Sequence, residues 1–270
     1  MSYSIRIFLC IFLGSLLFSC SQSNHTSGTR KTKISPHGYH VYLLMGQSNM
    51  AGRGPLTEEY LAMRYERVLM LDKENKWVPA RHPLHFDKPK VDGVGPGLSF
   101  GEEMAKAYPK DTIALVPCAV GGTSISKWEP GAFDKVTGTY PYDDAIRRMK
   151  EAQKKGTLKG IIWLQGESDS KPASAEKYLA RITALIERIR KEAGDPKLPF
   201  VVGELGRYRA KYCLINDELA RLSQQVPFTL MVSSEGLTHK GDTTHFDSPS
   251  AVEYGRRFAK GMLQLQKKKK

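Results

Sequence analysis

The sequence is poor in cysteine, and its acidic side chains are fewer than its basic ones. Four cysteines occur in 270 residues, and only Cys118 and Cys213 follow the first 20 positions. Two cysteines do not make a disulfide framework, and their spacing does not tell whether they pair. Cys118 ends an apolar run, which favours a buried thiol. A fold that depends on disulfides is therefore excluded.

The charge balance is basic, with 41 Lys and Arg against 28 Asp and Glu and a formal net charge of +13. Such a balance can indicate nucleic acid or an anionic surface as partner. The sequence has neither zinc-finger spacing nor an aromatic RNA-binding motif. Its charge is spread over amphipathic segments and a lysine run at 267–270. We interpret it as a solvated surface and predict no nucleic-acid partner.

The first residues are typical of an export signal. The apolar stretch 7–18 is too short for a comfortable membrane span and fits a signal-peptide core. It ends in LLFSC, which resembles a bacterial lipobox, although Phe18 departs from the usual small residue. We predict a lipoprotein-type signal peptide at 1–19, lipidation of Cys20, and a location at the cell envelope. The alternative is ordinary secretion or release into the periplasm. On the first reading, membrane contact is made only through the lipid anchor.

The remainder predicts one α/β domain. Residues 20–36 are polar and are interpreted as a flexible tether, 37–266 as the domain, and 267–270 as a basic tail. Short apolar runs predict strands at 41–45, 68–71, 113–118, 161–164, 200–203 and 228–232. Helices are expected at 98–108, 142–155 (closed by Gly156), 175–193 (closed by Gly194), 217–225 (capped by Asn216) and 249–265 (capped by Ser248). This alternation predicts a three-layer α/β/α sandwich around a mostly parallel sheet.

Polar motifs follow four of the predicted strands. They are GQSNMAG at 46–52, AVGGTS at 119–124, QGESD at 165–169 and DTTH at 242–245. Because the carboxyl ends of parallel strands meet at one edge of a sheet, we expect these motifs to lie together.

Ser48 is the candidate nucleophile, because a strand followed by Gly and then Ser presents the hydroxyl on a tight turn. Serine needs an adjacent base, and His245 is the candidate. Asp242, three residues earlier, can hold the imidazole in one tautomer. Glu167 is the alternative acid. The simpler reading of Ser48 is that it only caps the next helix.

An ester-cleaving site also needs donors for the oxyanion. The amides of Ser48 and Gly122 are two candidates. The third is the side chain of Gln165, because an ionised Glu167 can only accept hydrogen bonds.

The motifs GQSNMAG, GGTS with Trp128 soon after, WLQGESD and DTTHF together resemble a known family. From Tyr39 to Met262 the chain is similar to the sialate O-acetylesterase-like branch of the SGNH hydrolases. This branch includes the acetyl xylan esterases of carbohydrate esterase family six. The family at large has an Asn in its third block, whereas this chain has none between Ile161 and Ser170. Gln165 or Glu167 could take that place, and the need for a donor favours Gln165.

The resemblance implies a serine esterase that removes O-acetyl groups from carbohydrate without metal or cofactor. Acetylated xylan is the first candidate substrate. Sialate 9-O-acetyl esters, a lipid ester or thioester, and a non-catalytic carbohydrate-binding role are the alternatives. Arg53 and Trp128 are candidate sugar contacts; otherwise Arg53 is an ion-pair partner and Trp128 a core residue. The oligomeric state does not follow from the sequence.

Overall fold

The computed structural model describes residues 38–269. Its centre is a seven-stranded sheet in the order β3-β2-β4-β1-β5-β6-β7. All neighbouring strands run parallel except β2 and β3. The strands are β1 (Tyr39–Gly46), β2 (Val68–Leu71), β3 (Trp77–Pro79), β4 (Thr112–Pro117), β5 (Gly156–Leu164), β6 (Phe200–Gly203) and β7 (Thr229–Val232).

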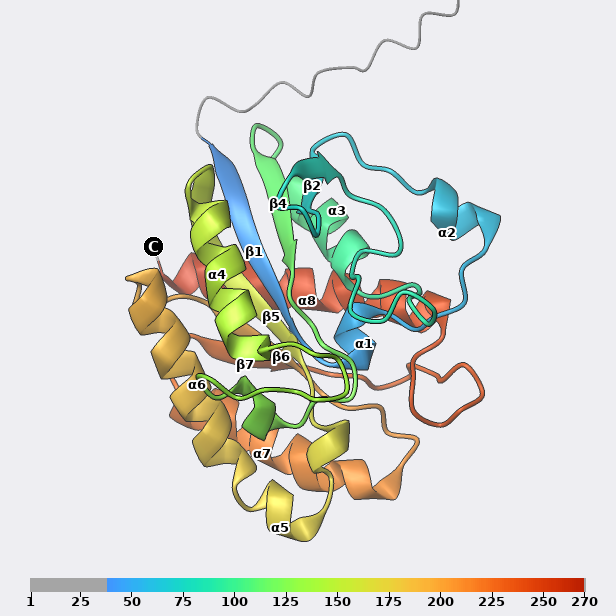
Figure 1. Ribbon diagram of the computed structural model, residues 1–270, viewed down its shortest axis with the longest axis vertical. Helices are drawn as coiled ribbons and strands as arrows, with labels where there is room; N and C mark the ends of the chain where they lie inside the picture. The colour runs from blue at the N-terminus through green and yellow to red at the C-terminus, as the bar shows by residue number, and fades with distance from the viewer. Residues whose placement is uncertain (1–37, 270) are drawn as a thin grey trace, which may run out of the picture. The chain divides into compact units, whose positions relative to one another are not determined.

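Helices cover both faces of this sheet (Figure 1). Two of them, α3 (Gly97–Ala107) and α8 (Ser248–Lys269), pack on each other and on one face. The other face carries α4 (Pro141–Gln153), α6 (Tyr178–Ala193) and α7 (Cys213–Gln225). Three short helices lie in the connections: α1 (Ser48–Ala51), α2 (Glu58–Ala62) and α5 (Pro172–Ala175). The predicted α/β/α sandwich is confirmed.

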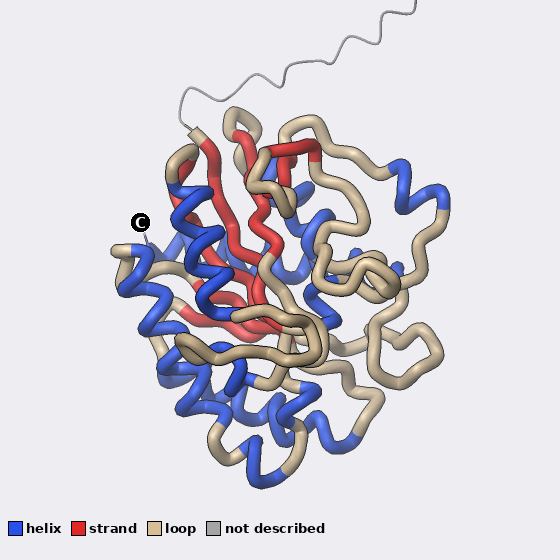
Figure 2. Tube along the Cα trace, viewed as in Figure 1, coloured by secondary structure: helices blue, strands red, loops and turns tan. Residues whose placement is uncertain are grey.

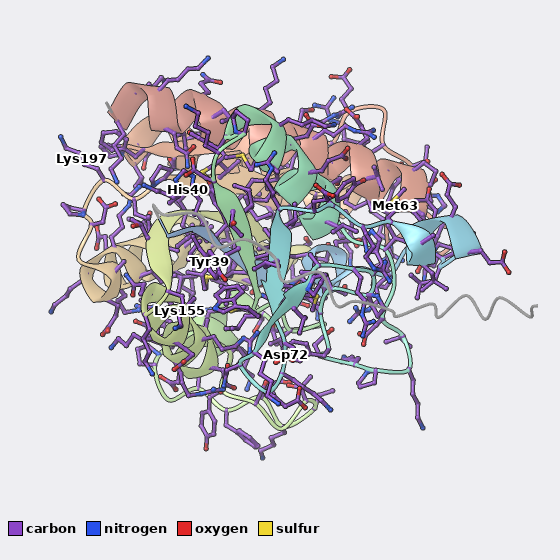
Figure 3. All side chains as sticks on the ribbon, turned by 90° about the horizontal axis from the view of Figure 1, so that it is seen from above. Tyr39, His40, Met63, Asp72, Lys155 and Lys197 are labelled. Carbon is purple, nitrogen blue, oxygen red and sulfur yellow. The ribbon has the colours of Figure 1, made fainter. Side chains whose placement is uncertain are left out.

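The central strands are buried on both sides, as the apolar runs predicted. In β1 only His40 is partly exposed, and the strand lies between β4 and β5. Its register pairs Gly46 with Leu164, so the carboxyl ends of β1 and β5 meet. The loops that follow these ends gather at one edge of the sheet (Figure 2). Tyr39 and Lys155 mark the opposite, amino edge (Figure 3).

Several element boundaries differ from the predictions. Gly156 does not close a helix; it begins β5 and pairs with Tyr39 of β1. The predicted helix 175–193 begins only at Tyr178 as α6, since Ala175 ends the separate helix α5; its end at left-handed Gly194 is as predicted. Asn216 lies inside α7 rather than capping it. Its side chain instead binds the backbone N–H and carbonyl of Leu205 at 2.8 and 3.1 Å.

The ends of the domain also differ. β3 was not predicted, because a three-residue antiparallel edge strand that ends in Pro79 has no clear apolar period. Helix α8 continues to Lys269, so Lys267, Lys268 and Lys269 form its last turn and not a separate tail. The predicted signal peptide, Cys20 and the tether lie outside the described residues. In the described part of the chain, we find no helix with the length and apolar character needed to cross a membrane.

Candidate active site

Ser48, His245 and Asp242 form one line of hydrogen bonds at the carboxyl edge of the sheet. Ser48 is the first residue of α1 and is separated from the end of β1 by Gln47 alone. His245 lies in the loop between β7 and α8, and its Nε2 is 3.0 Å from the Ser48 Oγ. The imidazole Nδ1 is 2.7 Å from the Asp242 Oδ2. This is the geometry by which an imidazole removes a hydroxyl proton while a carboxylate orients it.

The pKa values of Asp242 and His245 are those expected of a histidine base and the carboxylate that orients it. Burial alone raises the pKa of Asp242, but the backbone N–H groups of His245 and Thr244 and the imidazole together lower it to about 2. Both backbone groups donate to its Oδ1, at 2.8 and 2.9 Å. Burial lowers the pKa of His245 below 6.5, and Asp242 offsets only part of this effect. At neutral pH, Asp242 is therefore charged and His245 neutral.

Glu167 does not contact His245. Its Oε1 accepts a 2.5 Å hydrogen bond from the Nδ2 of Asn49, which also donates to the Thr244 carbonyl at 3.0 Å. The Oδ1 of Asn49 accepts the Phe246 N–H at 3.1 Å. Asn49 thus joins α1 to the histidine loop, and Glu167 holds the Asn49 amide. Burial raises the pKa of Glu167, and its Oε2 has no partner within residues 38–269.

Gln165 is not placed as the side-chain oxyanion donor. It is fully buried, and its Nε2 lies 2.9 Å from the Thr123 carbonyl and 2.7 Å from the Asp169 Oδ2. Tyr178 donates to its Oε1 at 3.0 Å. The prediction was wrong because these buried acceptors take up the amide hydrogens that were expected to face Ser48.

The structure points to Gln47 instead, a residue that our sequence reasoning missed. Its Oε1 receives the Gln165 Nε2 at 3.2 Å and, at 3.5 Å, the Ser168 N–H. For the Gln47 Nε2, the described residues provide no acceptor. Gln165 therefore orients the amide that directly precedes Ser48. The signal available in the sequence was the position of a donor-bearing side chain beside the nucleophile.

Two backbone amides complete the set of donors. Neither the Ser48 N–H nor the Gly122 N–H has an acceptor in the part of the chain that the structure describes. Gly122 has a φ of 85°, in the left-handed region, and its carbonyl accepts the Ser168 Oγ at 3.1 Å. Both N–H groups remain available to a substrate oxygen.

Arg53 and Trp128 are not placed as sugar contacts. The Arg53 side chain is 5% exposed and pairs with Asp87 at 2.8 Å, because its charge needs a partner inside the protein. Trp128 is fully buried, packs edge-on against Trp163, and its Nε1 donates to the Thr123 Oγ1. The alternative roles therefore hold: Arg53 is an ion-pair partner and Trp128 is a core residue. No three His, Cys, Asp or Glu side chains among residues 38–269 gather as metal ligands.

A serine, a histidine and an aspartate at the carboxyl edge of a parallel sheet have the arrangement that serine hydrolases use, here on an SGNH-like fold. The chain belongs to the family described as "Carbohydrate esterase, sialic acid-specific acetylesterase", which it matches over residues 38–264. It is thus a carbohydrate esterase, a carboxylic ester hydrolase, and the predicted family resemblance is confirmed.

Known proteins show the same likeness. The chain is 31% identical to a probable carbohydrate esterase of Arabidopsis thaliana over 245 residues, covering 83% of this chain and 90% of the relative. A solved Arabidopsis thaliana structure superposes with a TM-score of 0.75 at 29% identity, covering 84% of this chain and 98% of that one. NanS superposes with a TM-score of 0.70 at 20% identity, covering 87% and 99%. A carbohydrate acetylesterase from Xanthomonas citri gives 0.64 at 20% identity, covering 84% and 57%. The last two likenesses concern the fold alone.

Proposed function

We propose that the protein removes O-acetyl groups from a carbohydrate, with Ser48 as nucleophile, His245 as base and Asp242 as the residue that orients His245. The observation that carries this proposal is the pair of contacts at 3.0 Å and 2.7 Å that joins the three side chains. Family membership supports the acetyl ester as the bond that is cleaved.

In the first step, the Ser48 Oγ attacks the acetyl carbonyl carbon while His245 Nε2 takes the hydroxyl proton. The oxyanion accepts hydrogen bonds from the Ser48 and Gly122 N–H groups and from the Gln47 Nε2. The C–O bond to the sugar then breaks, and His245 returns the proton to the sugar oxygen. The products are a free sugar hydroxyl and an acetylated Ser48.

In the second step, water attacks the acetyl-serine while His245 removes one of its protons. The same donors stabilise the second oxyanion. The ester bond to the Ser48 Oγ breaks, the oxygen regains a proton from His245, and acetate leaves. Asp242 remains charged throughout and stabilises the imidazolium that forms twice.

Acetylated xylan remains our first candidate substrate. An O-acetylated sialic acid is the second, because Lys88 offers an unpaired cation at the site. Its Nζ lies 3.7 Å from the point where a side chain on Gly122 would begin, and no carboxylate within residues 38–269 forms an ion pair with it. We also propose that the enzyme is exported and lipid-anchored at Cys20, which would hold it near polymers outside the cell.

The test is acetate release from acetylated xylan, O-acetylated sialic acid and acetylated pectin, measured side by side. Ser48→Ala should lower kcat by on the order of 10⁶. Ser223→Ala, in α7, is the matched control and should keep full activity. Gln47→Ala should lower kcat by about 10²–10³, as the loss of one oxyanion donor does.

Activity that survives Ser48→Ala would sink the nucleophile assignment. A folded wild-type protein that cleaves no acetyl ester but binds one of the polymers would instead support the binding-only alternative.

A further inference from the structure

A buried charge cluster lies beside the proposed active site and takes no part in the mechanism above. It consists of Arg53, Asp87 and Asp92, whose side chains are 5%, 3% and 7% exposed. Arg53 lies 2.8 Å from the Asp87 Oδ2 and 3.9 Å from the Asp92 Oδ1. The Oδ1 atoms of both aspartates are buried without a hydrogen-bond partner among the described residues. Burying two carboxylates against one guanidinium is costly, because each charge loses its hydration.

One oxygen of this cluster joins the two loops that carry the proposed oxyanion donors. The Asp87 Oδ2 accepts the Gly121 N–H at 2.6 Å and the Arg53 Nη2 at 2.8 Å. Arg53 also donates from Nη1 to the Gly52 carbonyl at 2.7 Å, and Gly52 donates its own N–H to the Ser48 carbonyl. The nucleophile helix and the Gly121–Gly122 turn are thus tied to the same carboxylate.

The turn also rests directly on this ion pair. A Cβ atom on Gly121 would lie 2.4 Å from the Arg53 Nη2 and 2.8 Å from the Asp87 Oδ2. Any side chain at this position would therefore push the turn away from the pair. Since Asp87 binds the Gly121 N–H, the next N–H, that of Gly122, is the one left for the substrate.

The two aspartates are not equivalent. Burial raises the pKa of Asp87, but the hydrogen bond and charge of Arg53 outweigh it and hold that pKa below its usual value. Burial and then the Asp87 charge raise the pKa of Asp92 to about 6. His85, Lys88 and Lys90 are the other ionisable groups on this segment. Near pH 6, Asp87 therefore remains charged while Asp92 begins to be protonated.

We propose that Asp87, held by Arg53, is a positioning residue of the oxyanion hole, which fixes the Gly121–Gly122 turn so that the Gly122 N–H meets the oxyanion. This inference rests on the proposed function. A donor that contacts the oxyanion acts in the transition state and much less on the bound substrate. Loss of Asp87 should consequently lower kcat and leave KM nearly unchanged.

The test measures kcat and KM for p-nitrophenyl acetate with Asp87→Ala, Asp87→Asn and Asp92→Asn, together with wild type and Ser48→Ala. Asp87→Ala should lower kcat by about 10–10³ with KM within threefold. Asp87→Asn keeps an acceptor for the Gly121 N–H and should recover at least a tenth of wild-type kcat. Asp92→Asn is the matched control, because Asp92 does not touch the turn, and its kcat should stay within threefold.

Should Asp87→Ala fail to fold, Gly121→Ala moves the turn without removing the ion pair and should lower kcat in the same way. A folded Asp87→Ala or Gly121→Ala enzyme with unchanged kcat would overturn the proposal, as would an equal loss in Asp92→Asn. The controls separate the two claims. Wild-type activity that Ser48→Ala abolishes upholds the proposed function even if the Asp87 variants are fully active. An inactive wild type would overturn both.

Discussion

Two carboxylates lie close to the proposed nucleophile, and their surroundings give them different tasks. Asp242 accepts hydrogen bonds from two backbone N–H groups and from His245, which stabilises its charge. Glu167 is directed at the amide of Asn49, and burial disfavours its charged form. A carboxylate that orients a base must remain ionised, so these surroundings favour Asp242 for that task in the proposed mechanism.

Substitution of the two acids should separate these tasks. Asp242→Asn should lower kcat by about 10⁴, because an asparagine amide can hold the imidazole in the wrong tautomer. Glu167→Gln should lower it by less than about tenfold, since glutamine keeps the oxygen that accepts the Asn49 Nδ2. Steady-state kinetics with p-nitrophenyl acetate would measure both. The reverse order of effects would make Glu167 the triad acid.

The protonation of His245 predicts the pH dependence. His245 acts as a base only when neutral, and its pKa lies below 6.5. Activity should therefore rise as the pH rises through a midpoint below 6.5 and be fully present at pH 7. The pH profile of kcat/KM for an uncharged acetyl ester reports this midpoint. Asp92, with a pKa of about 6, titrates nearby, so Asp92→Asn should show the same limb. A wild-type midpoint above 6.5 would contradict this assignment.

At the scale of secondary-structure elements, Arg148 fastens α4 to the carboxyl ends of two strands. The side chain is buried, and its Nη2 and Nε donate to the carbonyls of Leu71, at the end of β2, and Pro117, at the end of β4, at 2.7 and 3.1 Å. Its Nη1 binds the Asp72 carbonyl at 3.0 Å. These carbonyls lie at or just beyond the last residues of the two strands, and one buried guanidinium donates hydrogen bonds to all three.

Arg148→Met should therefore destabilise the fold. Methionine fills similar space but leaves buried carbonyls without donors, which should lower the free energy of unfolding by about 2–4 kcal/mol. Urea unfolding followed by circular dichroism measures the difference. Arg147→Met is the control, because Arg147 is exposed and, among residues 38–269, pairs only with Asp144. It should change stability by less than about 0.5 kcal/mol. Equal effects of the two substitutions would show that the buried contacts contribute little.

At the scale of the whole molecule, the reactivity of the two cysteines in the described domain depends on whether the fold is intact. Both are free thiols; Cys118 is buried behind the end of β4, and Cys213 is exposed at the start of α7. Burial raises the pKa of Cys118 to about 11, although Arg148 offsets part of the rise. Cys118 should thus be unreactive until the sheet itself opens.

Alkylation of the native protein with iodoacetamide, read out by peptide mass spectrometry, should label Cys213 at least about 100-fold faster than Cys118. In denaturant, both thiols should react at similar rates, which is the control for intrinsic reactivity. Rapid labelling of Cys118 under native conditions would mean that the region behind the oxyanion turn opens without global unfolding.

The sequence by itself predicted most strands and helices in their order and the edge where the motifs collect. It also predicted Ser48 and His245 as partners, with Asp242 favoured over Glu167 as the acid. These features are local: buried parallel strands require unbroken apolar runs, and polar motifs directly after them have only one edge of the sheet to occupy. The same locality explains the misses. β3 has too few residues to show an alternation of apolar and polar side chains. Asn216 has the sequence position of a helix cap, but its side chain binds the backbone of Leu205.

Only the tertiary structure decided where the side chains point at that edge. Gln165 was expected to face Ser48, but it is turned toward Thr123 and Asp169 and orients Gln47. Arg53 was a candidate sugar contact or an ion-pair partner, and in the structure it is bound to Asp87. A buried amide or guanidinium must satisfy all its donors, and its partners come from segments far away in the chain. The tertiary contacts between those segments therefore decide which hydrogen-bond donor is left for the substrate.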